Sequence, residues 1–81
     1  MERYELTLTA HPGALAHVVA LVMGRRWSLG RLEYPEAEIP DRRRLVLDVD
    51  SGNRGDQVEA QLAKLYDVLS VRRIEEAPPP D

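Results

Sequence analysis

The sequence predicts a small α+β domain whose elements run strand–helix–strand–strand–helix–strand. Three observations support this order. An alternating segment ends at a proline-glycine turn and continues as an amphipathic helix over residues 4–23. A later helical segment, from residue 61, passes into a strand that ends at residue 74 with almost no connector. Between them lie two strand-like segments joined by a polar loop.

The first half of the chain predicts a strand followed by a helix. In residues 4–9, apolar and polar side chains alternate with the period of a sheet that has one buried face. A turn at residues 11–13 ends the strand, and Pro12 suits the first position of a helix. Residues 14–23 should then form the helix, closed by residues 24–26. The expected core stripe is Leu15, Val18, Val19, Val22 and Met23. A weaker second face holds Ala14, His17 and Leu21.

The middle of the chain predicts a hairpin. Its first strand, residues 27–34, changes phase at Gly30, which indicates a bulge. Residues 35–41 contain two prolines and three acids and should form the hairpin loop. In the second strand, residues 44–50, apolar residues alternate with polar ones. The inward residues should be Leu45, Leu47 and Val49, and the water-facing ones Asp48 and Asp50.

The last part predicts a second helix and a final strand. Asn53 is the expected N-cap, with Asp56 completing a pair that resembles a capping box. The helix should bury Val58, Leu62 and Leu65, and the last strand should use Val68, Leu69, Val71 and Ile74. Two halves with right-handed crossovers predict a four-stranded antiparallel sheet with both helices on one face. This arrangement is the ferredoxin-like sandwich.

Size and composition limit what the chain can be. An 81-residue chain holds one domain, which we place at residues 1–76, and we expect a disordered tail at residues 77–81, where three prolines occur. Because there is no cysteine, self-association is the expected source of extra stability. A net charge of −3 argues against nucleic-acid binding. Neither a signal peptide nor a membrane span is visible, so we expect a cytoplasmic protein without membrane contact.

The sequence lacks the residues of several chemistries that share this architecture. A metallochaperone needs soft thiolate ligands, and the chain has no cysteine. An RNA-recognition module needs exposed aromatic residues on its central strands, where Tyr4 is the only aromatic. The loop at residues 9–14 has no arginine with which an acylphosphatase-like enzyme would hold phosphate. We therefore expect neither catalytic nor metal-binding residues.

Three segments carry motifs of a known family. Residues 11–21, HPGALAHVVAL, resemble the PGxLxRxxxLF helix entry of many ACT domains. Residues 61–68, QLAKLYDV, resemble the QLxKLxDV motif of the regulatory small subunits of acetolactate synthase, also called acetohydroxyacid synthase. Residues 25–29 fit the RRGFNI segment of those subunits, with Arg26 in place of the glycine. The resemblance extends over residues 3–75.

The resemblance implies a non-catalytic subunit that binds and activates a separate large catalytic subunit of acetolactate synthase. Thiamine diphosphate, Mg²⁺ and FAD are expected in that large subunit, which joins two 2-oxo acids in branched-chain amino-acid synthesis, and no cofactor is expected in this chain. The resemblance also implies a homodimer in which the second strands pair edge to edge. The residues expected at the dimer or partner interface are Trp27, Leu29, Arg31 and Leu21.

The resemblance also locates a site for a branched-chain amino-acid effector, between the first strand–helix loop and the second strand. The residues expected there are His11, Pro12, Gly13, Ala14, Ser28 and Leu29. Feedback-sensitive members carry asparagine at the positions of Ala10 and Ser28, and loss of such a hydrogen bond costs about one to two decades of affinity. The chain is therefore similar to the short, valine-insensitive type. The alternative hypothesis is a stand-alone amino-acid sensor.

Overall fold

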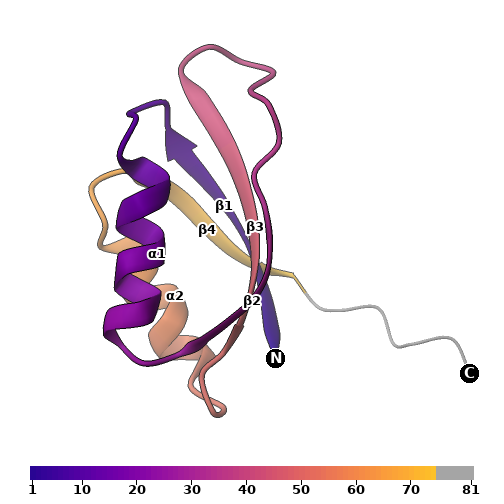
Figure 1. Ribbon diagram of the computed structural model, residues 1–81, viewed down its shortest axis with the longest axis vertical. Helices are drawn as coiled ribbons and strands as arrows, with labels where there is room; N and C mark the ends of the chain where they lie inside the picture. Colours follow the sequence, from indigo (N-terminus) through magenta and orange to yellow (C-terminus); the bar gives the residue numbers. More distant parts are fainter. Residues whose placement is uncertain (75–81) are drawn as a thin grey trace, which may run out of the picture.

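The computed structural model describes residues 1–74 as a sheet covered on one face by two helices (Figure 1). The elements in chain order are β1 Glu2–Thr9, α1 Ala14–Gly24, β2 Ser28–Glu33, β3 Arg42–Asp50, α2 Gly55–Ala63 and β4 Val68–Ile74. The strands are ordered β2-β3-β1-β4, and every neighbouring pair is antiparallel. The predicted ferredoxin-like sandwich is confirmed. The predicted tail, residues 77–81, lies outside the described residues.

Strand β1 forms the centre of the sheet and of the core. It pairs with β3 on one side and β4 on the other, so that Leu6 lies between Leu45 and Val71. Its apolar residues face the helices and are fully buried, as the alternation predicts; they are Tyr4, Leu6 and Leu8. The Tyr4 hydroxyl donates to the carbonyl oxygen of Gly55 at 3.3 Å, which fastens the start of α2 to the sheet.

Helix α1 buries Val18 and Val22 as predicted, but the remaining buried residue, Ala14, comes from the predicted weaker face. Leu15 is only partly buried, and Met23 is 60% exposed, so the prediction was wrong for Met23. The helix is apolar on most of its circumference, and its sequence therefore fits more than one stripe. Packing against the sheet selects the row spaced by four residues.

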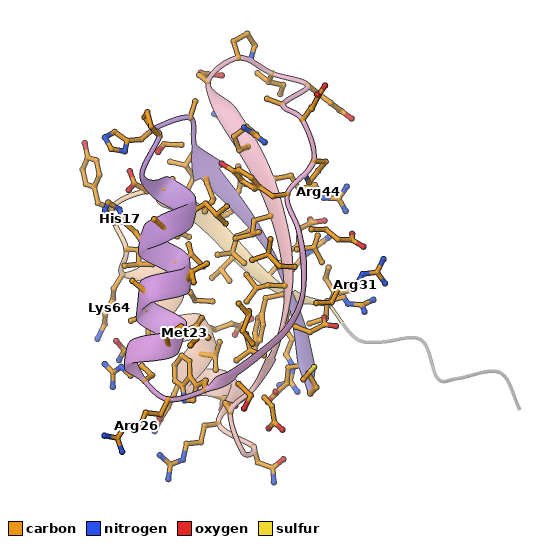
Figure 2. The ribbon with its side chains drawn as sticks, viewed as in Figure 1. His17, Met23, Arg26, Arg31, Arg44 and Lys64 are labelled. Carbon is orange, nitrogen blue, oxygen red and sulfur yellow. The ribbon has the colours of Figure 1, made fainter. Side chains whose placement is uncertain are left out.

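The C-terminus of α1 is closed by a Schellman motif. The Trp27 N–H donates to the Val22 carbonyl oxygen at 3.2 Å, and the Arg26 N–H donates to the Met23 oxygen at 3.0 Å. This geometry needs a left-handed residue after the C-cap, and Arg26 supplies it with a φ of 60°. In Figure 2 the Arg26 side chain extends away from the domain below α1. The chain therefore uses a strained arginine where glycine is the usual residue.

Replacing Arg26 by glycine is expected to stabilise the domain by about 1 kcal/mol. Glycine adopts the left-handed conformation without the steric cost that a Cβ atom brings. The free energy of unfolding, measured by urea denaturation, would show the gain. Arg25→Gly is the matched control, because Arg25 has a φ of −86° and should gain nothing. An equal change in both variants would contradict the explanation.

Strands β2 and β3 form the predicted hairpin with small differences in their bounds. The register between them shifts between Leu29 and Leu32, so the bulge expected at Gly30 is confirmed. Strand β3 begins at Arg42, two residues before the predicted start. Arg43 holds the hairpin loop in place: its Nη2 donates to the Pro35 carbonyl oxygen at 2.8 Å. Its guanidinium also lies 4.0 Å above the Tyr34 ring.

The helix-free face of the sheet carries cross-strand ion pairs, and one of them overturns a prediction. Asp50 is exposed, but Asp48 is only 6% exposed and does not face water. Arg3 lies directly opposite Asp48 in the register and covers it, with bonds of 2.8 and 3.2 Å to the two carboxylate oxygens. Glu5 is paired in the same way with two arginines from neighbouring strands, Arg44 and Arg72.

Helix α2 begins differently from the prediction. Arg54 is the N-cap, and Asn53 has a φ of 71°, which is outside the extended range of a capping residue. The turn is held by side chains instead. The Ser51 Oγ accepts the Arg54 N–H at 3.0 Å, and an Asp50 oxygen accepts the Gly52 N–H at 3.1 Å. Val58 and Leu62 are buried as predicted, whereas Leu65 is only partly buried.

Candidate functional site

The loop between β1 and α1 is fastened to the turn that precedes β4. The Thr9 N–H donates to the Asp67 carbonyl oxygen at 2.9 Å. The Asp67 side chain, in a residue only 4% exposed, accepts the Thr9 hydroxyl at 3.1 Å and contacts the His17 Nδ1 at 2.6 Å. One buried carboxylate therefore holds the end of β1 and the first turn of α1 together.

His11 forms hydrogen bonds within the same loop. Its Nδ1 accepts the Gly13 N–H at 3.0 Å, and its carbonyl oxygen accepts the Ala14 N–H at 3.0 Å. Its ring also lies parallel to that of His17, with the centroids 6.4 Å apart. The Gly13 amide, expected to face an effector carboxylate, is therefore already hydrogen-bonded within the loop.

The residues expected in an effector site form two groups, which lie at opposite ends of α1 in a single copy of the chain. Residues 11–14 precede or open α1, whereas Ser28 and Leu29 come after its end, at the start of β2 (Figure 1). An 11-residue helix separates them, which is roughly 16 Å in length. Ser28 is exposed and Leu29 is partly buried. A site that uses both groups would need a second copy of the chain.

The expected interface residues also differ in their surroundings. Trp27, expected at an interface, is only 9% exposed and packs in the core of the single chain. The residue comes before β2 begins, and the Schellman motif turns it inward. Leu21 and Leu29 are partly buried against the core. Arg31 projects from the sheet on the side away from the helices and pairs with Glu33 (Figure 2).

Asp67 is the site residue that sequence reasoning missed. In the sequence, Asp67 stands out only as part of the QLAKLYDV motif. Its partner Thr9 lies 58 residues away, so no local spacing links the two. The signal that the sequence offers is an aspartate placed between the predicted second helix and the last strand.

The hydrogen bond from His17 lowers the pKa of Asp67, and the bond from Thr9 adds to this effect while burial opposes it. A carboxyl group with a lowered native pKa stabilises the fold above its ordinary pKa of 3.8. That stability is lost as the pH falls through the lower, native pKa. The hydrogen bonds of the Asp67 carboxylate should therefore contribute fully to the stability of the fold at neutral pH, and this contribution should be lost in acid.

Asp67→Asn is expected to be less stable than the original protein at neutral pH, with the difference shrinking below about pH 4 as the carboxylate of the original protein becomes protonated. Urea midpoints measured at several pH values between 7 and 2.5 would show this convergence. Asp41→Asn, in the exposed hairpin loop, is the matched control and should change little at any pH. A gap between Asp67→Asn and the original protein that stays constant into acid would contradict the role given to the carboxylate.

Within residues 1–74, no group of three or more His, Cys, Asp or Glu side chains is placed to hold a metal ion. None of the helices in this part of the chain is long and apolar enough to cross a membrane. The described residues offer a fastened loop and a sheet with two edge strands.

The order of the elements and of the strands defines a ferredoxin-like domain of the ACT class. The profile described as "AHAS small subunit-like ACT domain" matches residues 5–70. Because this match covers most of the sequence, the chain belongs to the family of AHAS small subunit-like ACT domains. The resemblance inferred from the motifs is confirmed.

Individual relatives agree with this assignment. The small subunit of acetolactate synthase isozyme 1 of Escherichia coli K12 is 31% identical over 74 residues, which cover 91% of this chain and 77% of the relative. The acetolactate synthase small subunit of Thermotoga maritima superposes with a TM-score of 0.83 at 27% identity. That match covers 95% of this chain and 48% of the other, so the chain spans about half the Thermotoga subunit.

The ACT domain of the GTP pyrophosphokinase of Chlorobium tepidum superposes with a TM-score of 0.74 at 9% identity. The match covers 94% of this chain and 86% of that domain. At this identity the likeness shows the shared fold alone.

Proposed function

We propose that this chain binds and activates a separate catalytic subunit of acetolactate synthase in branched-chain amino-acid synthesis. Its membership of the small-subunit family is the observation that supports this proposal best. Activation requires the chain to bind the active conformation of the catalytic subunit more tightly than the inactive one, since only differential affinity shifts a population. Thiamine diphosphate, Mg²⁺ and FAD would belong to the catalytic subunit.

The chain is proposed to act as a homodimer joined through β2. Two strands, β2 and β4, form the edges of the sheet. On β4, the Arg73 N–H is occupied by a Glu59 carboxylate oxygen at 3.2 Å, and two arginines charge the strand. Such features oppose pairing with another strand. Within the described residues, no side chain caps the main chain of β2 in this way, which favours β2 as the edge that pairs.

The chain is proposed to be of the valine-insensitive type, with an effector site that does not bind valine. Ala10 and Ser28 stand where feedback-sensitive members carry asparagine, and the Gly13 N–H is used by His11. Calorimetry with valine and without a catalytic subunit tests this point. Heat of binding at micromolar to millimolar valine would instead favour the alternative, a stand-alone amino-acid sensor.

The activating role is tested by measuring acetolactate formation by the purified catalytic subunit with and without this protein. We expect the rate to rise and the two chains to co-elute in gel filtration. The isolated ACT domain of an unrelated enzyme, such as the GTP pyrophosphokinase domain, serves as the fold-matched control. An unchanged rate together with separate elution would overturn the proposal.

A further inference from the structure

Two neighbouring histidines, His11 in the β1–α1 loop and His17 in α1, form hydrogen bonds that require opposite tautomers. We propose that proton uptake strengthens the bond of His17 to Asp67 but breaks the bond of His11 to Gly13, so that acidification frees the Gly13 amide while α1 stays fastened. Asp67 and His17 are then positioning residues of this loop. An effect of this proton uptake on activation rests on the proposed function, whereas the assignment of the two tautomers is independent of it.

The His17 tautomer follows from its partner. An ionised aspartate only accepts hydrogen bonds, so the His17 Nδ1, 2.6 Å from an Asp67 oxygen, must carry a proton. The Nε2 atom then holds the lone pair that takes up a second proton. Protonation there leaves the bond to Asp67 in place and adds a charge to it, which makes the bond stronger.

The His11 tautomer is the reverse. A main-chain N–H can only donate, so the His11 Nδ1, 3.0 Å from the Gly13 nitrogen, must be unprotonated. The proton of the neutral ring is on Nε2. Protonation at Nδ1 removes the lone pair that accepts the Gly13 N–H, and the bond is lost. The Gly13 amide then becomes available at the start of α1.

The surroundings of the two rings direct the outcome. Their centroids are 6.4 Å apart, so two protonated rings repel each other across the stack. Asp67 lies at hydrogen-bond distance from His17 and can compensate only one charge directly. Lys64 and Tyr66 are exposed in the segment between α2 and β4 that also contains Asp67. In the described part of the chain they form no ion pair or hydrogen bond with either ring. A charge on His11 has no hydrogen bond to Asp67, whose carboxylate oxygens contact Thr9 and His17, and its attraction to Asp67 is Coulombic only.

NMR spectroscopy of the isolated protein tests the tautomers directly. Long-range ¹H–¹⁵N spectra at pH 8 should show the proton of His17 on Nδ1 and that of His11 on Nε2. On acidification, the Gly13 amide resonance should move with the titration of His11. The proposal is overturned if the two rings share one tautomer, or if the Gly13 amide does not follow His11.

His11→Asn is the variant that separates proton uptake from loop structure. An asparagine side chain can accept the N–H two residues further on, as in an Asx turn, and it does not titrate in this range. The Gly13 amide resonance should therefore stay constant between pH 8 and 5.5 in this variant. His17→Gln, which can still donate to Asp67, should leave the response of His11 in place; its disappearance would count against the assignment of the switch to His11.

The effect on activation is measured between pH 7.5 and 5.5, normalised to the catalytic subunit alone at each pH. Activation by the original protein should fall by up to about tenfold, because this is the pH range in which histidine side chains in general change charge. His11→Asn should flatten the profile. An original protein that activates equally at every pH would overturn the coupling of the loop to activation. Absence of activation at all pH values would instead remove the proposed function and leave the NMR result standing.

Discussion

Replacing Arg31 by proline is expected to convert the proposed dimer into monomers and to abolish activation of the catalytic subunit. Arg31 lies at the bulge of β2, where the register gives it no partner on β3, and its side chain is 66% exposed. A proline there should leave the β2–β3 ladder intact. It removes a main-chain donor from the outer edge, which is how natural edge strands block pairing. Sedimentation velocity would show the loss of the dimer.

Arg31→Ala is the matched control, because it removes the charge and the ion pair with Glu33 but keeps the main-chain N–H. It should remain dimeric and activating. Circular dichroism of Arg31→Pro would confirm that the monomer stays folded. If that folded variant remains a dimer, the association does not use the β2 edge and another face of the chain must carry it.

The second large effect is expected in the core. Leu6→Ala should lower the free energy of unfolding by about 2–5 kcal/mol, because Leu6 is fully buried at the centre of the sheet and its loss leaves a cavity. A domain of this size has a total stability of roughly 4–12 kcal/mol. The variant should therefore unfold at a much lower urea concentration, and part of it could already be unfolded at 37 °C.

Leu69→Ala provides the comparison within the same residue type. Leu69 is 52% exposed at the start of β4, beside a shift in the register with β1, and its truncation should change the free energy of unfolding by about 0.5 kcal/mol or less. Because both variants make the same leucine-to-alanine change, the difference between their free energies of unfolding reports the effect of burial. Similar losses in both would contradict the assignment of Leu6 to the core.

The buried residues of an element were predictable where its hydrophobic pattern allowed only one buried face. Strand β1 has strict alternation, so its buried residues could be named in advance, and the phase change at Gly30 correctly indicated a bulge. Helix α1 has apolar residues on most of its surface, so its existence and the burial of Val18 and Val22 were predictable, but the exposure of Met23 was not. The N-cap of α2 failed for a similar reason. Several polar residues in that turn could have capped the helix, and Asn53 instead took a left-handed conformation.

The site was predictable only where the family motif supplied it. Residues 11–13 were identified from the motif, but the engagement of the Gly13 amide by His11 depends on a side-chain orientation that no spacing encodes. Asp67 and Asp48 were missed because their partners, Thr9 and Arg3, lie 58 and 45 residues away. A carboxylate in a sequence looks the same whether water or a distant strand satisfies it.

The sequence by itself determined the order of the elements, the central strand and the family, because these depend on local periodicity and on motifs that are contiguous in the chain. The tertiary structure decided which face of α1 is buried, that Trp27 turns inward, and that one aspartate fastens the β1–α1 loop. These features arise from contacts between segments far apart in the chain. Their free energy depends on distances and burial that exist only after the sheet has formed.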